Sequence, residues 1–322
     1  MEPEMQVGTG GVPSSSGATR SAAATTRSRR AFVLTALLAV AALAATGNDA
    51  TICVKAQVAS ESVTVADGAN HGKNLKIIGV SSDKSTLSSL TINGGFANVD
   101  VLGLGVQTGT TITGAKVTMR GVKLASTGST PALYVRQVSS LTTNVVCDGC
   151  DIGGGTSGQS VQVDNSYSTP TGLAITNSYI HGGYYGVYVY GSGSQLTLSL
   201  VNDTIDRAQV GLYVGSAVGQ ITVVNDILSN HTQYALYLPT GLTVTHGHNA
   251  LFGNTNNYSG AAVDGTGYVK TDCMLDPSAT GIPQTKPGSP CRGAADATKA
   301  PATDFWNAPR GTAIDIGAVQ GS

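Results

Sequence analysis

The sequence predicts an all-β fold: a right-handed parallel β-helix, or solenoid, of about seven coils with an irregular C-terminal cap. A two-part motif recurs every 23 to 28 residues through the middle of the chain. Its strands are short, alternate apolar with polar residues, and are separated by Gly, Ser, Asn and Thr. Residues 73–255 contain no helical period long enough to cross over a sheet, so each repeat is interpreted as one coil that pairs with the next.

Two sequence markers define the repeat. The first is a strand that ends in a polar residue and is followed three positions later by an aliphatic residue, as in LAITNSYI (173–180). Its final aliphatic residues are Leu124, Ile152, Ile180, Ile205, Leu228 and Leu251. The second marker is a short strand with an aliphatic–polar–aliphatic core, centred on Tyr134, Gln162, Tyr188, Tyr213 and Tyr237. Both spacings shorten together from 28 residues to 23 or 24, so the markers belong to one repeat. A propeller blade would need about 40–50 residues.

The chain is expected to divide into three parts. Residues 1–47 are interpreted as a disordered n-region and a signal peptide, residues 48–257 as the β-helix, and residues 258–322 as the cap. A basic cluster precedes an apolar run of 15 residues at 31–45, which is short for a membrane span but typical of a signal-peptide core. We therefore expect cleavage near 44–48, no stable membrane span afterwards, and a secreted or cell-surface protein. An uncleaved N-terminal anchor is the alternative.

The export route and the charge of the chain narrow the expected partners. The segment SRRAFVL (28–34) resembles the twin-arginine export signal of bacteria, with Arg29 and Arg30 as the pair. Charged residues make up 11% of the chain and its formal net charge is −1, which gives no electrostatic reason to expect nucleic acid. Apolar residues at regular positions argue against a disordered chain. We expect a monomer.

Three segments of the tail carry a resemblance to a known family. GSPCRGAAD (288–296), ATDFWNAPRG (302–311) and AIDIGAVQ (313–320) occur in this order. They resemble the C-terminal signature of choice-of-anchor Q domain proteins, which are bacterial, exported, and built on a right-handed parallel β-helix with pectate-lyase-like repeats. The resemblance implies a fold and a compartment rather than a reaction. Cys291 and Arg292 depart from the small and aliphatic residues usual there. The absence of a sorting anchor after Gln320 favours free secretion or N-terminal tethering.

Equivalent residues of successive coils form columns, and one column is rich in tyrosine. Its members lie between two inward aliphatic residues, so they are expected to point outward. Such a strip would combine apolar ring faces with a polar rim, and sugar rings stack on surfaces of this kind. The alternative is that the tyrosines only stabilise each other across the strands. The candidate carbohydrate-binding residues are Tyr134, Tyr188, Tyr213 and Tyr237.

Three aspartates are the candidate catalytic residues. Asp203 and Asp226 follow Asn202 and Asn225, which belong with Asn177 to a predicted column of stacked amides, and Asp206 lies just beyond. Carboxylates about 5 Å apart repel, which raises one pKa or recruits a cation. Glycosidases use paired acids at such separations, and lyases of this fold use acidic groups with Ca²⁺. The alternative is a solvated turn, because Asp is a common turn residue.

The five cysteines suggest at least one disulfide. Cys273 and Cys291 bracket an 18-residue stretch of the tail, and a bridge between them would brace the cap. Cys147 and Cys150 are close enough to bond to each other or to face other partners. No zinc site is expected, because a second Cys or His pair at ligand spacing is missing.

Three functions are compatible with these observations. The leading hypothesis is an exported β-helix protein that binds extracellular or cell-surface polysaccharide. The first alternative is a polysaccharide lyase or glycoside hydrolase that uses Asp203, Asp206 and Asp226, with Ca²⁺ if it is a lyase. The second alternative is a non-catalytic structural surface protein or adhesin whose columns only hold the coils together.

Overall fold

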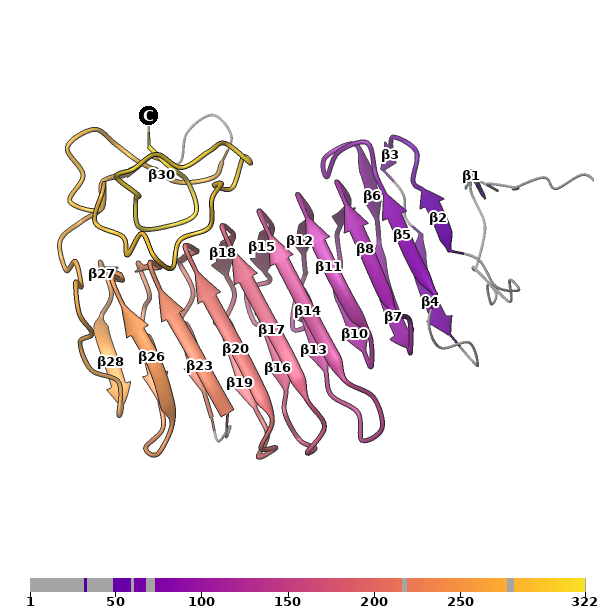
Figure 1. Cartoon of the computed structure of the whole chain (residues 1–322), viewed down its shortest axis with the longest axis horizontal. Helices are drawn as coiled ribbons and strands as arrows, with labels where there is room; N and C mark the ends of the chain where they lie inside the picture. Colours follow the sequence, from indigo (N-terminus) through magenta and orange to yellow (C-terminus); the bar gives the residue numbers. More distant parts are fainter. Residues whose placement is uncertain are drawn as a thin grey trace, which may run out of the picture. The chain divides into compact units, whose positions relative to one another are not determined.

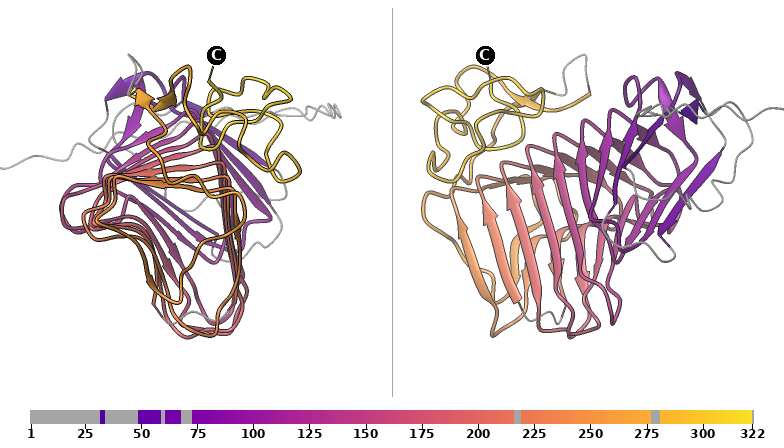
Figure 2. Two further views of the ribbon diagram at one scale, coloured as in Figure 1. Left: turned by 90° about the vertical axis from the view of Figure 1, so that its left-hand side faces the viewer. Right: turned by 45° about the vertical axis from the view of Figure 1, so that its right-hand side comes forward.

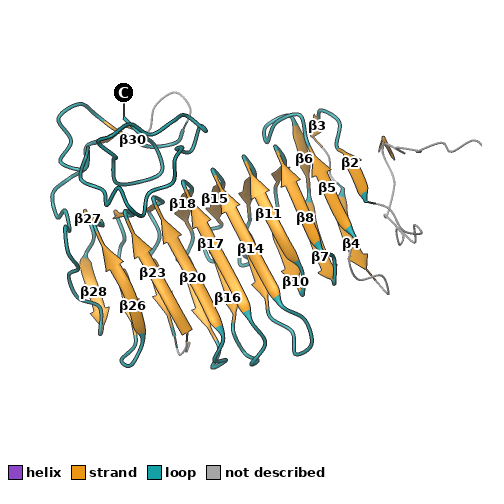
Figure 3. Cartoon of the chain, in the orientation of Figure 1, coloured by secondary structure: helices purple, strands orange, loops and turns teal. Residues whose placement is uncertain are grey.

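The computed structural model describes residues 32–33, 49–58, 61–67, 73–215, 219–276 and 281–321. All of them belong to one compact unit, residues 31–322. This part of the chain contains strands, turns and loops and no α-helix (Figures 1 and 3). The predicted n-region and signal peptide (1–47) lie outside the described residues, except for Phe32–Val33. No helix among the described residues is long and apolar enough to cross a membrane.

Three parallel sheets run along the stack of coils, and each coil contributes one strand to each sheet. Sheet A contains β1 (Phe32–Val33), β2 (Ala50–Cys53), β5 (Asn74–Ile78), β8 (Asn98–Leu102), β11 (Lys116–Arg120), β14 (Thr143–Asp148), β17 (Thr171–Thr176), β20 (Leu196–Val201), β23 (Gly219–Val224) and β26 (Thr243–Gly247). Sheet B contains β3 (Gln57–Val58), β6 (Ser85–Leu87), β9 (Gly105–Val106), β12 (Lys123–Ala125), β15 (Asp151–Gly154), β18 (Tyr179–Gly182), β21 (Thr204–Asp206), β24 (Ile227–Ser229) and β27 (Ala250–Phe252). Sheet C contains β4 (Ser62–Asp67), β7 (Ser89–Gly94), β10 (Thr110–Thr113), β13 (Leu133–Arg136), β16 (Gln159–Asp164), β19 (Tyr185–Tyr190), β22 (Val210–Val214), β25 (Tyr234–Leu238) and β28 (Asn256–Gly260). The fold is therefore the predicted parallel β-solenoid.

The register confirms the alignment of the repeats. The first marker forms one inward column of sheet B, in which Leu124 pairs with Ile152, Ile152 with Ile180, and so on to Leu251. The second marker pairs in the same way along sheet C. The solenoid has about eight turns, slightly more than the predicted seven. The early strands β4 and β7 pair in register through Val63-Thr64-Val65 and Leu90-Thr91-Ile92, which have the aliphatic–polar–aliphatic core of the second marker.

The core consists of the inward columns of the three sheets. Strands β5 and β11 show the pattern of alternately exposed and buried residues that the period of two requires. Ile77, Ile92, Leu124 and Ile180 are fully buried and belong to one cluster that runs along the coils. Each such side chain contributes roughly 1.5–3 kcal/mol relative to an exposed one. The solenoid is thus stabilised by apolar residues stacked from coil to coil.

From Gly103 onward, the corner between sheets A and B places one residue of each coil in the left-handed region. In coil order these residues are Gly103, Gly121, Gly149, Asn177, Asn202, Asn225 and His248, with φ between 52° and 63°. They are equivalent because the residues before them pair across sheet A. Glycine and asparagine are the residues that adopt this conformation most readily. The column changes from Gly to Asn between Gly149 and Asn177, and this change divides the corner into two halves.

The C-terminal residues do more than cover the end of the stack. Gly247 and Ala250 form parallel bridges with Thr266 and Val269, so residues 261–270 add a partial coil over the end of the core. The following residues, which include the short antiparallel pair β29 (Leu275–Asp276) and β30 (Gln284–Thr285), lie along one side of the solenoid (Figure 2). We expected the whole of 258–322 to act as an end cap. The packing instead makes residues 291–318 a lateral segment, called the strap below.

The strap docks on the asparagine half of the corner. The main chain of Asp296 exchanges two hydrogen bonds with the Asn225 amide, at 2.7 and 3.0 Å. Asn202 Nδ2 donates to the Asp315 carbonyl at 3.0 Å. Below these contacts, the outward residues Ile227 and Ala250 of sheet B pack against Cys291 and Ile316. The predicted asparagine column therefore lies at the surface that binds the strap, and its only amide-to-amide bond links Asn225 to Asn202 at 3.1 Å.

Arg310 is the central polar contact between the strap and the solenoid. Its guanidinium donates to Asn177 Oδ1 at 2.8 Å and to the carbonyls of Gly317 and Ala318 at 3.0 Å each. The side chain is buried, and burial lowers its pKa while it stays a cation under all ordinary conditions. The Gly317 carbonyl also accepts from Asn202 Nδ2 at 3.3 Å and the Ala318 carbonyl from Phe305 N at 2.9 Å, so Arg310 is a second donor to each.

We expect Arg310→Ala to reduce the free energy of unfolding by about 3 kcal/mol, because it removes the Arg310 donor from Asn177 Oδ1 and the charged donor from the Gly317 and Ala318 carbonyls. Urea denaturation measures the loss, and limited proteolysis should show earlier cleavage within residues 281–321. Arg136→Ala, at an exposed site on sheet C, is the matched control and should change stability by less than about 0.5 kcal/mol. Equal stability and equal protease resistance of both variants would contradict the anchoring role of Arg310.

Candidate functional site

Asp203 and Asp226, two of the predicted catalytic residues, are fully buried in the corner between sheets A and B. They belong to a column in which each backbone N–H donates to the side chain of the next coil. Ser178 N donates to Asp203 Oδ1 at 2.7 Å, Asp203 N to Asp226 Oδ1 at 2.7 Å, and Asp226 N to Asn249 Oδ1 at 2.8 Å. The column therefore satisfies the backbone of the turn, which is a structural task.

Burial raises the pKa of both carboxyl groups well above the ordinary value. For Asp226 the neighbouring Asp203 adds to this effect, whereas backbone donors act in the opposite direction. A raised pKa is a property of general acids. Here, however, the carboxyl groups have no exposed surface from which to contact a polymer. The geometry does not support the predicted catalytic role of Asp203 and Asp226.

Asp206, the third candidate, lies apart from them on the outer side of sheet B. Its carboxylate contacts Arg207 Nε at 2.9 Å and accepts hydrogen bonds from Ser229 Oγ at 2.9 Å and Asn230 Nδ2 at 2.8 Å. Only 6% of its side chain is exposed. Both oxygens are occupied by protein groups, so Asp206 holds neighbouring coils together and does not form a pair with Asp203 or Asp226.

The predicted tyrosine column lies on the outer face of sheet C, where its side chains are half-buried. The rings stack on each other: Tyr213 and Tyr237 have centroids 4.3 Å apart and planes 10° apart. Tyr188 stacks with Tyr185 at 4.6 Å, and Tyr134 reaches the group through a hydroxyl–hydroxyl contact of 2.8 Å with Tyr190. Because the ring faces contact one another, they offer edges and hydroxyl groups to the solvent. This arrangement favours mutual stabilisation over stacking of sugars.

The structure contains a cleft that the sequence did not reveal. It has a volume of about 790 Å³ and lies between the glycine half of the corner and residues 303–307 of the strap. Gly103, Gly121 and Gly149 line one side. Phe305 and Trp306 line the other, and Trp306, the only tryptophan of the chain, is 50% exposed. The missing side chains of the glycines and the end of the docked strap together create this space.

Asp304 fixes the turn that carries the tryptophan. Its Oδ1 accepts hydrogen bonds from the backbone N–H groups of Trp306 at 3.0 Å and Ala308 at 2.9 Å, and its Oδ2 accepts one from Gln320 at 3.1 Å. Phe305 contacts Trp306 edge to face, with ring centroids 4.7 Å apart. The indole is therefore held in place although it is exposed. The segment ATDFWNAPRG (302–311) supplies both this turn and Arg310.

Charged side chains from two sheets face the cleft. Arg120 Nε lies 4.0 Å from Asp148, whose other oxygen accepts a hydrogen bond from Asn177 Nδ2 at 3.0 Å. Asp151 also lines the cleft. Its carboxylate lies 3.5 Å from Lys123 Nζ and 2.9 Å from His181 Nε2. Both carboxylates thus have a basic side chain as a neighbour.

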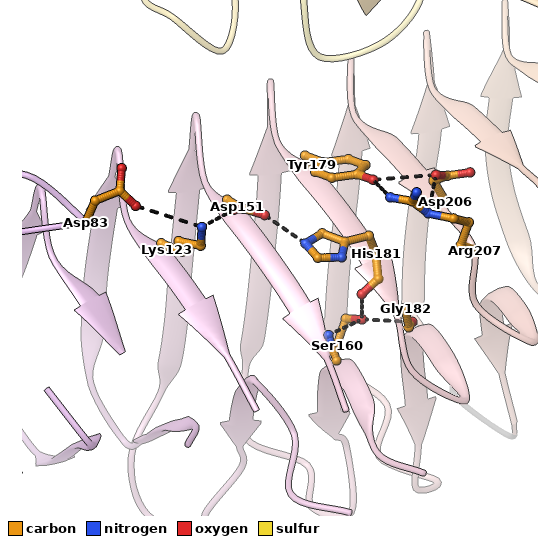
Figure 4. Close-up of polar contacts among 10 residues, drawn as sticks. Asp83, Lys123, Asp151, Ser160, Tyr179, His181, Gly182, Asp206 and Arg207 are labelled. Carbon is orange, nitrogen blue, oxygen red and sulfur yellow. Dashed lines mark hydrogen bonds and ion pairs between the residues drawn. The ribbon is translucent and has the colours of Figure 1, made fainter. Parts of the chain in front are cut away.

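A row of polar side chains continues from the cleft along sheet B (Figure 4). The His181 ring stacks on Tyr179, with centroids 4.5 Å apart, and leans over Gly153, where a β-carbon would meet the ring at 2.8 Å. The Tyr179 hydroxyl contacts Arg207 and lies 3.5 Å from Asp206. Burial raises the pKa of Tyr179 to about 12, so it remains a neutral donor. The row extends over several coils beside the strap.

Four of the cysteines are buried, and two of these form a disulfide. Among the described residues, no three His, Cys, Asp or Glu side chains lie close enough together to hold a metal ion. Cys273 and Cys291 form a disulfide that is buried beneath the strap together with Ile227 and Ala250. Cys147 and Cys150 are free and buried.

We expect Asp226→Asn to stabilise the protein at neutral pH. The amide keeps the acceptor for Asp203 N, and its new N–H group should donate to the Leu200 carbonyl, as Asn249 Nδ2 donates to the equivalent Val223 carbonyl at 2.7 Å. Because the folded-state pKa of Asp226 is raised, its favourable contribution is present at low pH and is lost as pH rises through that pKa. The advantage of the variant should therefore grow from about pH 4 to about pH 7, by about 1.4 kcal/mol for each unit of pKa difference.

Urea denaturation across this pH range measures the difference between the two chains. Burial lowers the pKa of His231 to about 4, so stability also falls as pH drops below about 6.5, but this effect is common to both chains and cancels. Asp206→Asn is the matched control, and it should destabilise by about 1–2 kcal/mol because it weakens contacts to a charged group. A pH-independent loss of stability in Asp226→Asn would contradict the raised pKa.

Comparison with known proteins does not assign the chain to a family. No protein-family model matches the chain, and no curated protein matches it at a significant level. The candidate function of the cleft therefore depends on its own side chains.

Proposed function

We propose that the protein binds a polysaccharide outside the cytoplasm and that the glycan occupies the cleft beside Trp306. The observation that carries this proposal is a half-exposed indole, held by the Asp304 turn, facing charged and polar side chains across an open cleft. Sugar rings present apolar C–H faces and a rim of hydroxyl groups, which an indole and such polar side chains complement. The cleft volume of about 790 Å³ falls within the range of ligand pockets.

The charges around the cleft favour a neutral glycan. The charged residues that line the cleft are Arg120, Asp148, Asp151 and Asp304, so the cleft has no excess of positive charge to select a polyanion. Paired side chains still offer donors and acceptors to hydroxyl groups. Because they are already ordered by their partners, binding a chain costs little additional side-chain entropy.

Export and surface association form the second half of the proposal. The basic cluster and apolar run at residues 27–45 support a signal peptide, and the three tail segments support a place among choice-of-anchor Q proteins of the pectate-lyase-like β-helix type. On this proposal the chain acts as a monomer that is secreted or held at the cell surface. The Tyr134, Tyr188, Tyr213 and Tyr237 column then serves mainly to stabilise sheet C.

We expect Trp306→Ala to weaken glycan binding at least about ten-fold, which corresponds to about 1.4 kcal/mol, with little change in stability. Affinity gel electrophoresis against a panel of soluble glucan, xylan, mannan and polygalacturonate identifies the ligand and measures the loss. Tyr167→Ala is the matched control, because Tyr167 is another aromatic residue of similar exposure, at 47%, outside the cleft lining. Tyr213→Ala tests the predicted strip.

The results distinguish binding in the cleft, binding on sheet C and no binding. Loss of retention in Trp306→Ala alone supports the cleft, and loss in Tyr213→Ala alone would return the binding site to sheet C. If the unmodified chain is retained by none of the four polymers, the binding proposal fails and a purely structural surface protein becomes the better explanation.

A polysaccharide lyase is a second candidate, and the contact between His181 and Asp151 is the observation that favours it. An imidazole oriented by a carboxylate can remove a proton from a substrate, and His181 is one-third exposed beside the cleft. Incubation with polygalacturonate, with and without added Ca²⁺, tests this candidate through the absorbance of unsaturated products. Product that forms with the unmodified chain and is lost in His181→Ala would establish the lyase, whereas no product under either condition would exclude it for this polymer.

A further inference from the structure

One coil differs from its neighbours at the corner between sheets A and B. Cys147 occupies the inward position at which the next coils carry Ile175 and Leu200, and both Cys147 and Cys150 are fully buried. Between them lie only Asp148 and Gly149. Two thiols therefore close a four-residue turn at which the following coil has the polar Ser178 in place of the second thiol.

Both thiols lie in the apolar core, three residues apart in one turn. Both side chains are fully buried in the same cluster, and Cys150 Sγ lies 3.8 Å from the carbonyls of Met119 and Asp148, the residue that follows Cys147. Their surroundings are therefore shielded from water. A disulfide needs two β-carbons at short range, and a four-residue turn keeps the two cysteines close along the chain.

The same turn forms part of the cleft. Asp148 and Gly149 line it, and Asp151 follows directly after Cys150. Gly149 presses against the strap: a β-carbon built on it would lie 2.9 Å from the Phe305 carbonyl oxygen, next to Trp306. Any change in the conformation of the turn therefore acts on the residues that hold the tryptophan.

We propose that Cys147 and Cys150 form a second disulfide when the chain folds under oxidising conditions, and that this bond fixes the cleft wall opposite Trp306. The bond arises by thiol–disulfide exchange with a small external disulfide such as oxidised glutathione. Two S–H bonds are lost, one S–S bond forms, and the two electrons and two protons pass to the external disulfide, which leaves as two thiols.

Burial determines when the exchange takes place. The contact with Cys150 and burial both raise the pKa of Cys147, so the folded chain contains little of the thiolate that exchange requires. The bond therefore forms before the coil is covered by its neighbours. Once formed, it is protected from reductants in the native state.

The experiment is refolding of the full chain from urea and dithiothreitol in either oxidised or reduced glutathione. Cys53→Ser serves as the background, because it removes the remaining free thiol. After denaturation, alkylation and tryptic digestion, residues 137–207 form one peptide that contains both cysteines. We expect this peptide to be unalkylated and two hydrogen masses lighter after oxidative refolding, and doubly alkylated after reductive refolding.

Trp306 reports on the cleft without any glycan, because it is the only tryptophan. Its quenching by acrylamide should differ between the oxidised and reduced forms of the Cys53→Ser chain. In the additional variant Cys147→Ser/Cys150→Ser, quenching should be the same in both buffers, which controls for the disulfide between Cys273 and Cys291.

Two results would overturn the proposal. One is a doubly alkylated 137–207 peptide from oxidatively refolded chains in which Cys273 and Cys291 have formed their bond. The other is identical Trp306 quenching in chains with and without the Cys147–Cys150 bond. Neither readout uses a polysaccharide, so failure of the glycan-binding proposal leaves this inference standing, and the reverse also holds.

Discussion

The fold depends on one backbone constraint, which is that the coils from Gly103 onward turn from sheet A to sheet B through a residue with positive φ. The strands of these coils stay in register because each coil makes this turn at the same place. Glycine and asparagine satisfy the constraint at low cost, and the solenoid uses glycine from Gly103 to Gly149 and asparagine from Asn177 to Asn225. The residue at this position also determines the surface of the corner. An asparagine places an amide group there, whereas a glycine has no side chain. The asparagine half binds the strap, and the glycine half leaves the space that becomes the cleft.

The buried polar groups of the corner follow from the same geometry. A tight turn leaves backbone N–H groups inside the solenoid, and these need acceptors. Asp203, Asp226 and Asn249 supply them from the next coil, and burial raises the pKa of both carboxyl groups, which favours their neutral form. On the outside of the corner, the Arg310 guanidinium donates hydrogen bonds to the Gly317 carbonyl of the strap and to the Asn177 amide oxygen. Structural polar contacts, not catalysis, account for most of the charged residues that the corner contains.

The sequence predicted the features that depend on local periodicity and missed those that depend on distant contacts. Repeat length and alternation were enough to identify the solenoid and the columns through Leu124 and Tyr188, because register follows from which residues are apolar. The interpretation of Asp203 and Asp226 as surface acids failed because Asp is common both in exposed turns and in buried ones, and the sequence does not distinguish them. The sequence does not show the cleft, because Phe305 meets Gly149 only after the strap has returned along the corner. The sequence feature that relates to the cleft is the change from Gly149 to Asn177 along the corner column.

The position of the cleft also follows from where the strap stops. Docking requires an amide at the corner, and the first one in coil order is that of Asn177, to which Arg310 binds. One coil earlier, Gly149 has no side chain to offer, and the Phe305 carbonyl lies against its α-carbon, so the main chain of the strap turns back there. Asp304 caps that reversal, and the residue at its tip, Trp306, projects over coils that have no strap of their own. Trp306 remains half exposed at this tip, with Phe305 edge to face against it. The proposed glycan, with its apolar ring faces and polar rim, would cover the exposed part of the indole.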